Sequence, residues 1–245
     1  MKRYRVALIG CGRMGATIDD EVKDRKNSFL WLPYSHAAAV VACDRMDLIA
    51  VSDVVEEKVE SIRELYDVPV CYTDYREMIE KEKPDIVCIA TRPFTHEEIT
   101  VFAAENGVKG IYCEKPLCCS MAEADRMVKA VDKNGVKFNY GTQRRYTPVY
   151  RKMRELMDAG EIGKIEAVIS HCGVGSALWG QTHGADMVQF LADTTSKLAA
   201  DPPPAATLVG GCWGCSHFSN CFGQTDNPIT DLSKPKQESI SELSR

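Results

Sequence analysis

A glycine-rich turn near the amino terminus constrains the fold more than any other feature of the sequence. The run VALIGCGRMGA places Gly10, Gly12 and Gly15 in the spacing G-x-G-x-x-G, directly after a short apolar segment. In a strand–turn–helix unit the first glycine permits the tight turn, the second admits a pyrophosphate, and the third lets helix and strand pack closely. We therefore expect a dinucleotide site here, with Arg13 and Met14 in the same turn. The alternative is an ordinary glycine-rich strand–helix turn.

Apolar runs alternate with helical patterns along residues 1–141. The apolar runs are rich in Val, Ile, Tyr and Cys and are nearly continuous, as in strands covered on both faces. This alternation predicts an α/β fold with a doubly wound parallel sheet, the Rossmann arrangement. We expect strands at 4–10, 47–53, 68–72, 85–91, 109–114 and 136–141, and helices at 56–65, 95–107 and 120–135.

A second region begins at residue 142. Its pattern predicts a helix at 147–163, a strand at 164–172 and a helix at 183–200. We interpret residues 142–210 as a partial α/β domain for substrate binding or oligomerisation. Residues 211–245 form a tail that contains cysteines and is polar at its end, and we expect it to be largely disordered.

Composition excludes several classes of function. The formal net charge is −5 and no basic stripe is visible, so a nucleic-acid partner is not expected. No apolar run reaches the roughly 20 residues of a membrane span, and the amino-terminal run is too short for a signal peptide. The 11 cysteines lie mostly singly in apolar segments, which indicates a reducing cytoplasm and no disulfide framework.

Asp53 follows the second predicted strand. An acid at this position hydrogen-bonds the ribose hydroxyls of a bound adenosine, and its charge repels the extra phosphate of NADP. NAD is therefore the expected cofactor, and NADP is disfavoured. Asp53 lies 38 residues after Gly15 (53 − 15), where about 20 is usual, and residues 24–46 supply the extra length. A plain strand-end aspartate is the alternative.

Four segments together resemble the glucose–fructose oxidoreductase / inositol dehydrogenase (Gfo/Idh/MocA) family: the glycine turn, DIVCIATRPFTHEEI, CEKPL and NYGTQRRYTPVY. The resemblance runs from about residue 4 to 210. It implies a Rossmann domain, a second α/β domain with an open-faced sheet, and hydride transfer between NAD(P) and a hydroxyl or keto carbon of a sugar or cyclitol. The further cofactor residues that it implies are Thr91, Arg92, Pro93, His96, Glu114, Lys115 and Arg145, with Gln143 and Arg144 beside them.

The resemblance also implies an acid–base pair in the motif HGAD. His183 and Asp186 are three residues apart in a predicted helix, so they share a face. A histidine beside a carboxylate is a natural acid or base near neutral pH. We expect His183 to remove a hydroxyl proton, Asp186 to orient the substrate or the histidine, and cationic Lys115 to stabilise charge on the substrate oxygen. The alternatives are a solvated His–Asp face and a surface lysine paired with Glu114.

The pattern departs from the family in two places. Trp179 and Gln181 stand where the family usually has Asp and Gly, and the resemblance ends after Gly210, so we expect a shortened second domain. Arg144, His171 and Trp179 are expected to line a polyol substrate pocket. An exposed sheet edge in a shortened domain favours association of copies, giving a homo-oligomer.

The tail CWGCSHFSNCF holds Cys212, Cys215, His217 and Cys221, which are zinc-ligand types. They are crowded into one short loop, and the EKP and H-x-x-D patterns explain more residues. We therefore assign no metal and do not expect a zinc-dependent alcohol dehydrogenase. The expected function is an NAD-dependent oxidoreductase acting on a polyol, and the alternative is a shortened, catalytically silent NAD-binding relative.

Overall fold

The computed structural model describes residues 3–30, 32–163, 165–170 and 181–192. The chain divides into two compact units. The first comprises residues 1–119 and 123–143, and the second comprises residues 120–122 and 144–245. Residues 211–245, predicted to form a disordered tail, lie outside the described residues.

Six parallel strands form one sheet in the first unit, in the order β3-β2-β1-β4-β5-β6. This is the order of a doubly wound Rossmann sheet, in which the strand order reverses between β1 and β4. The predicted fold is therefore confirmed, and every predicted strand of residues 1–141 overlaps an observed one. The strands are β1 (Tyr4–Ile9), β2 (Met46–Ser52), β3 (Val70–Tyr72), β4 (Ile86–Ile89), β5 (Gly110–Cys113) and β6 (Lys137–Tyr140).

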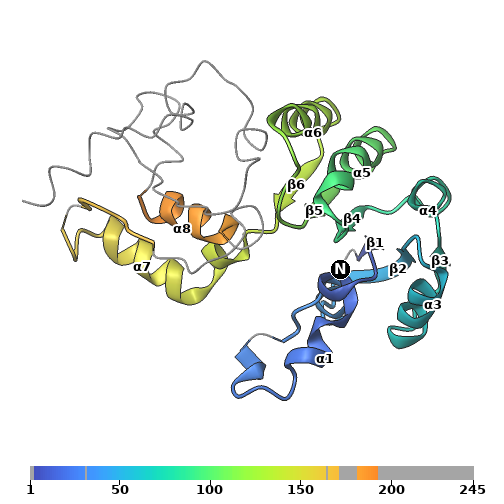
Figure 1. Cartoon of the computed structure of the whole chain (residues 1–245), viewed down its shortest axis with the longest axis horizontal. Coiled ribbons are helices and arrows are strands. Elements are labelled where there is room, and N and C mark those ends of the chain that lie inside the picture. Colours follow the sequence, from blue (N-terminus) through green and yellow to red (C-terminus); the bar gives the residue numbers. More distant parts are fainter. Residues whose placement is uncertain (1–2, 31, 164, 171–180, 193–245) are drawn as a thin grey trace, which may run out of the picture. The chain divides into compact units, whose positions relative to one another are not determined.

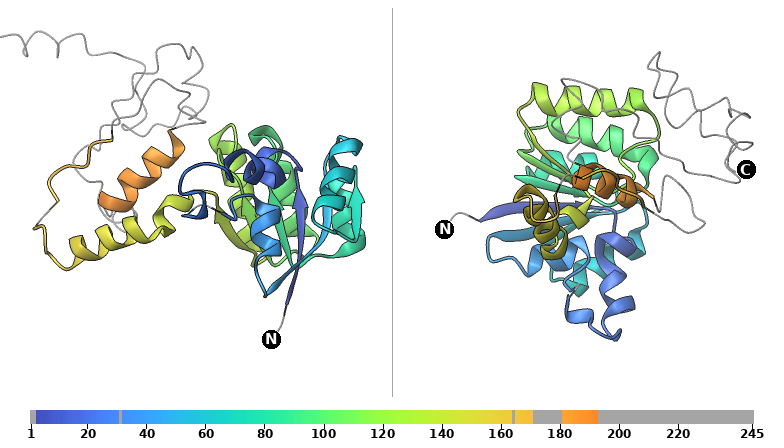
Figure 2. Two further views of the ribbon diagram at one scale, coloured as in Figure 1. Left: turned by 90° about the horizontal axis from the view of Figure 1, so that it is seen from below. Right: turned by 90° about the vertical axis from the view of Figure 1, so that its left-hand side faces the viewer.

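Helices cover both faces of this sheet (Figures 1 and 2). Side chains alternate between the faces along each strand, so Ala7 and Ile9 of β1 belong to one apolar core, and Val6 and Leu8 belong to the other. The first core includes side chains of α4 (Tyr75–Glu82), α5 (Pro93–Glu105) and α6 (Met121–Lys133). The second includes side chains of the π-helical turn η1 (Arg13–Thr17), α2 (His36–Val41) and α3 (Glu56–Leu65). Burial on both faces explains the continuous apolar runs.

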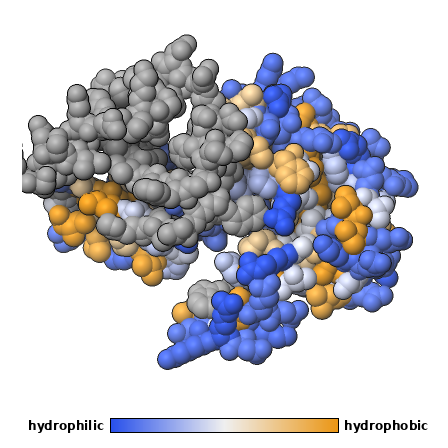
Figure 3. Space-filling model, in the orientation of Figure 1, coloured by the Kyte–Doolittle hydropathy of each residue, from blue (hydrophilic) through white to orange (hydrophobic). Residues whose placement is uncertain are grey.

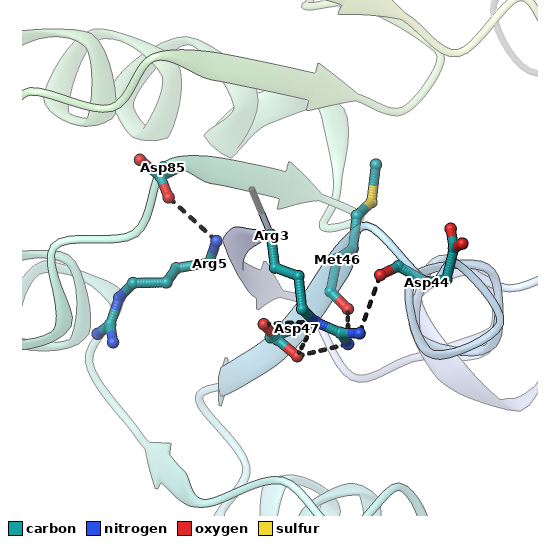
Figure 4. A network of polar contacts seen from close by, with 6 residues as sticks. All are labelled: Arg3, Arg5, Asp44, Met46, Asp47 and Asp85. Carbon is teal, nitrogen blue, oxygen red and sulfur yellow. Dashed lines mark hydrogen bonds and ion pairs between the residues drawn. The ribbon is translucent and has the colours of Figure 1, made fainter. Parts of the chain in front are cut away.

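Polar contacts at the amino ends of the strands hold β1 between its neighbours (Figure 4). The Arg3 Nε donates to both carboxylate oxygens of Asp47, at 2.9 and 3.0 Å, and its Nη atoms donate to the carbonyls of Asp44 and Met46. The Arg5 N–H donates to Asp85, just before β4. The Arg3 and Asp47 side chains are about half exposed, so their ion pair contributes little to stability.

Residues 24–46 do more than lengthen a connection. After α1 (Ile18–Val22) the chain makes an excursion through η2 (Ser28–Leu30) and returns as α2, which the sequence analysis did not predict. The Asp19 carboxylate accepts the N–H groups of Tyr34 and Ser35, both at 2.8 Å, and so ties the end of the excursion to its start. Ala37 and Val40 then pack on the sheet. The Ser35 cap before an alanine-rich run was the available signal for α2.

The described part of the second unit contains two longer helices, α7 (Pro148–Asp158) and α8 (Thr182–Ala192). The Arg154 guanidinium on α7 donates to the carbonyl of Leu191 at 2.9 Å, which ties the two helices together. Within the strand predicted at 164–172, the described residues 165–170 have no regular secondary structure, and residues 164, 171 and 172 lie outside the described residues. A strand needs a hydrogen-bonded neighbour, and all strands of the described residues belong to the first unit.

One side of α7 is apolar. Val149, Met153 and Leu156 follow the spacing of a single helix face and are exposed, and Figure 3 shows hydrophobic side chains gathered there. This is the pattern of an amphipathic helix. Among the helices that the structure describes, none has both the length and the apolarity needed to cross a membrane.

Candidate active site

The carboxyl edge of the parallel sheet gathers the candidate site residues of the first unit. Each predicted segment begins where a strand ends, and in doubly wound sheets ligands bind at this edge, near the reversal of strand order. The segments are Gly10–Gly15 after β1, Asp53 after β2, Thr91–Pro93 after β4, and Glu114 and Lys115 after β5. The topology therefore brings these residues to one edge.

The glycine turn has the geometry of a phosphate-binding turn. Gly10 has a φ of +98°, and a side chain there would meet the Ala90 carbonyl at 2.7 Å. A Cβ on Gly15 would lie 1.9 Å from the Gly10 oxygen, so only glycine allows the helix to approach the strand this closely. A Cβ on Gly12 would meet nothing within 4 Å. The backbone at Gly12 is thus open on the side that a pyrophosphate would approach, and the turn fits the cofactor.

Asp53 contacts the glycine turn. One carboxylate oxygen accepts the Cys11 N–H at 2.9 Å, and the other accepts the Val55 N–H at 3.1 Å. Each oxygen of an ionised carboxylate has two lone pairs, so both can still accept a ribose hydroxyl. The half-buried carboxylate is held at the turn, and this position fits the predicted role in binding adenosine ribose.

Lys115 belongs to a loop fixed at several points. The Glu114 N–H donates to the Ile89 carbonyl at 2.9 Å and continues the sheet ladder. The Lys115 N–H donates to the Glu114 carboxylate at 3.1 Å, and the Leu117 N–H donates to the Tyr140 hydroxyl at 3.1 Å. Lys115 is half-buried, so the loop presents a lysine at the carboxyl edge on a fixed backbone.

Glu114 pairs with His36, a residue that the sequence analysis missed. The His36 Nε2 lies 3.1 Å from Glu114 Oε1, and both side chains are about 10 % exposed or less. Burial lowers the pKa of His36, but hydrogen bonds with Cys88 and Glu114 outweigh burial and raise it to about 9. Burial alone would raise the pKa of Glu114, yet His36 and the Lys115 N–H hold it below its usual value. The pair is therefore an imidazolium and a carboxylate at neutral pH.

No local pattern could have joined these two residues, because they are 78 positions apart in the chain. His36 stands as the first residue of α2, and Glu114 follows β5. The Glu114 side chain is turned inward toward His36. The expected contact of Glu114 with the cofactor stays a prediction.

His96 is fully buried, which corrects its expected contact with the cofactor. Its Nδ1 lies 3.1 Å from the Leu117 carbonyl and its Nε2 lies 3.3 Å from the Thr91 carbonyl. The side chain has no accessible surface for a ligand to touch. Burial lowers the pKa of His96, although these backbone hydrogen bonds oppose that effect. The geometry supports a bridge between the segments after β4 and β5.

The segment after β4 starts helix α5. Arg92 is the exposed residue before the helix, and Pro93 occupies its first turn. The Thr95 hydroxyl donates to the Thr91 hydroxyl at 2.8 Å, which fixes the half-buried Thr91 side chain. Thr91, Arg92 and Pro93 thus lie where the sequence placed them, at the carboxyl edge.

The second unit brings three predicted residues together. His183 and Asp186 lie on α8, three residues apart, and both are about 9 % exposed. The Arg145 Nε donates to Asp186 at 3.1 Å, a second guanidinium nitrogen pairs with the other carboxylate oxygen, and Arg145 also stacks over the Phe190 ring at 5.6 Å. Asp186 is therefore held by a cation, and of the two residues on α8, His183 is the better candidate for a base.

The remaining predicted residues are exposed, half-buried or outside the described part of the chain: Arg13 is exposed, and Met14 and Gln143 are half-buried. Arg144 is exposed in η3 (Gln143–Tyr146). His171 and Trp179, predicted to line a substrate pocket, lie outside the described residues. So do the zinc-ligand types of the tail, Cys212, Cys215, His217 and Cys221.

Comparison with known proteins gives a clear family match. A family model described as an oxidoreductase family with an NAD-binding Rossmann fold matches residues 4–142. That span contains the glycine turn, Asp53 and Lys115, and it ends close to the end of the first unit.

Individual relatives agree with the family match. A myo-inositol 2-dehydrogenase of Thermotoga maritima is 31% identical over 160 residues, which are 65% of this chain and 42% of the relative. A 2,7-anhydro-N-acetylneuraminate hydratase of Mediterraneibacter gnavus is 27% identical over 94% of this chain and 58% of its own length. The scyllo-inositol dehydrogenase structure from Lactobacillus casei with NAD(H) and scyllo-inositol has a TM-score of 0.63 at 18% identity, covering 78% of this chain and 57% of that one. The chain spans about half the length of these relatives.

Proposed function

The chain belongs to the Gfo/Idh/MocA oxidoreductase family, with its NAD-binding Rossmann fold, and we propose that it is an NAD-dependent oxidoreductase acting on a polyol. The reaction is hydride transfer between the nicotinamide and a hydroxyl or keto carbon of a sugar, cyclitol or related compound. The observation that carries the proposal is the carboxyl edge, where the open glycine turn and the fixed Lys115 loop both lie. The inositol dehydrogenase among the relatives supports a polyol substrate.

In this proposal the cofactor is held by the glycine turn and by Asp53. The open backbone at Gly12 leaves room for the pyrophosphate. The Asp53 carboxylate accepts the ribose hydroxyls, and its charge disfavours the extra phosphate of NADP. When bound, NAD supplies the acceptor for a hydride.

Lys115 acts as a cation that stabilises negative charge on the substrate oxygen. The ammonium donates hydrogen bonds to an oxygen that becomes more negative as its proton leaves, which lowers the barrier. The role needs a lysine whose backbone does not move, and the hydrogen bonds of Glu114 and Leu117 supply that condition.

His183 acts as the general base of the second unit. A neutral imidazole accepts the hydroxyl proton near neutral pH. Asp186 has a charge that Arg145 already balances, so we assign Asp186 a positioning role on the same helix. Residues 142–210 then serve substrate binding.

The test begins with the purified chain. NADH binding is measured by nicotinamide fluorescence, and oxidation of inositols, hexoses and amino sugars is followed by NADH formation. The panel includes 2,7-anhydro-N-acetylneuraminate with loss of the substrate as the readout, because hydration leaves no net NADH. NADH formation with a panel member supports the proposal, and NADH binding without turnover of any compound favours the catalytically silent relative.

Lys115→Met provides the residue-level test. Methionine keeps the length of the side chain and removes its charge, so kcat should fall at least about a hundredfold while NADH affinity stays within a few-fold. Full turnover by Lys115→Met would exclude the assigned role. Glu77→Gln, on the exposed part of α4, is a matched control that should change neither quantity.

We further expect copies of the chain to associate through the second unit, and we expect a cytoplasmic location. Light scattering at several protein concentrations measures the association of copies. A fluorescent fusion observed in cells of the source organism shows the location of the protein.

A further inference from the structure

His36 lies next to the Lys115 loop and has no role in the proposed reaction. Its Nε2 faces Glu114 Oε1 at 3.1 Å, and the other Glu114 oxygen accepts the Lys115 N–H at 3.1 Å. A single carboxylate therefore joins the imidazole of α2 to the backbone of the lysine. We propose that His36 is a positioning residue for Lys115, acting through Glu114; the inference rests on the proposed role of Lys115.

The position of His36 is itself fixed. The preceding residue, Ser35, has its N–H bound to Asp19 at 2.8 Å and its hydroxyl bound to the Ala38 N–H at 3.2 Å. The His36 ring packs edge-on against Tyr112 of β5, with ring centroids 4.9 Å apart. A positioning residue must be held by its own neighbours, and this one is held by its helix start and by the sheet.

Two further side chains, one half-buried and one fully buried, contact the far end of the same loop. Tyr140 accepts the Leu117 N–H, and His96 lies at the Leu117 carbonyl. At the near end of the loop, the Glu114 carboxylate accepts the Lys115 N–H. Without a hydrogen-bond donor at position 36, the buried carboxylate would have one oxygen unsatisfied and would turn toward solvent or toward the Lys115 ammonium. Either change would displace the lysine, and a displacement of about 1 Å can cost a hundredfold in rate.

A pair of substitutions separates this role from a general structural one. In His36→Gln the side-chain amide nitrogen is as many bonds from the backbone as Nε2, so it can still donate to Glu114. In His36→Asn the amide nitrogen stops at the position of Nδ1 and cannot reach. Both variants are polar and of similar bulk, and Glu77→Gln again serves as the surface control.

We expect His36→Asn to lower kcat by about ten- to a hundredfold with the KM for NAD within about threefold. His36→Gln should keep kcat within about threefold of the wild type. Hydrogen exchange measured by mass spectrometry should become faster at residues 114–119 in His36→Asn and stay slow in His36→Gln. Exchange in β1 and β4 should change in neither variant.

The exchange measurement needs no substrate, so it decides the inference even when the proposed function fails. The inference is overturned when the two variants match each other in kcat and in exchange at 114–119. It is also overturned when His36→Asn speeds exchange equally throughout the sheet, because that result describes general destabilisation. If neither His36 variant folds, the exchange comparison is made with Glu114→Gln, which removes the carboxylate charge. Unchanged exchange at residues 114–119 in that variant overturns the inference.

Discussion

Alanine substitutions at Gly15 and Gly12 should separate two tasks of the glycine turn. A Cβ on Gly15 would stand 1.9 Å from the Gly10 carbonyl oxygen. The closest ordinary carbon–oxygen contact is about 3.3 Å, so the helix would have to retreat from the strand by about 1.4 Å. Gly10 is itself closely packed, since a Cβ on it would lie 2.7 Å from the Ala90 carbonyl. The strain falls on two backbone segments and no flexible side chain can absorb it.

The expected cost of Gly15→Ala is about 3 kcal/mol of unfolding free energy, the upper part of the usual range for overpacking. For a chain of this size that loss corresponds to roughly 6–12 °C in Tm. Gly12→Ala meets no atom within 4 Å, and the residue has φ −83°, which alanine adopts freely. Its Tm should stay within about 2 °C of the wild type, because removing a glycine also reduces the entropy of the unfolded chain.

Gly12→Ala, which should leave Tm nearly unchanged, should instead weaken cofactor binding. Gly12→Ala places a methyl group where the pyrophosphate would approach, so the dissociation constant of NADH should rise at least about tenfold in a fully folded protein. Thermal unfolding by circular dichroism and NADH fluorescence measure the two quantities. Gly110→Ala is the control, because its Cβ would make only ordinary contacts, the nearest at 3.5 Å to the Ile86 side chain.

Two results would refute this account of the turn. Equal loss of Tm in Gly12→Ala and Gly15→Ala would show that close packing is not confined to Gly15. Unchanged NADH affinity in a folded Gly12→Ala would show that the pyrophosphate does not approach the backbone there.

Three further predictions concern charged groups. The folded pKa of His36 is raised to about 9 from an ordinary 6.5, so its stabilisation is complete below pH 6.5 and is lost as pH rises to 9. The loss is about 3 kcal/mol at most, and urea unfolding at several pH values should show it in the wild type and not in His36→Gln. Asp53→Asn should shift the ratio of NAD to NADP affinity toward NADP by about tenfold, measured by fluorescence titration, and an unchanged ratio would contradict the role of the carboxylate charge. Arg145→Met should destabilise the second unit by about 2 kcal/mol because Asp186 stays buried without its cation, and Arg145→Lys should restore only part of this in the same urea assay.

Much of the first unit could be predicted because its signals are local. Three features can each be identified from a few neighbouring residues: a glycine at φ +98°, a strand apolar on both faces and an acid at a strand end. The strand predicted at 164–172 shows where local signals are insufficient. An apolar pattern favours the strand conformation, but a strand also requires a hydrogen-bonded neighbouring strand. His96 shows another limit. The sequence indicates where His96 lies along the chain, but its exposure to a ligand depends on the packing of the folded protein, in which it is fully buried.

The His36–Glu114 pair could not be predicted for a different reason. Its energy depends on two side chains that only the fold brings together, and the local sequence around Glu114 gives no indication of His36 as its partner. The same fold resolves the spacing that first counted against Asp53. The extra residues leave the sheet after α1, and Asp19 ties the chain at Tyr34 and Ser35 to that helix before α2 packs on the sheet. The excursion ends before α2, and β2 follows α2 in its usual place beside β1. Asp53 at the end of β2 therefore still accepts the Cys11 N–H of the glycine turn at 2.9 Å. A spacing rule measures distance along the chain, whereas a dinucleotide site requires only that β1 and β2 end side by side, and their pairing from Tyr4–Met46 to Ile9–Ser52 provides this.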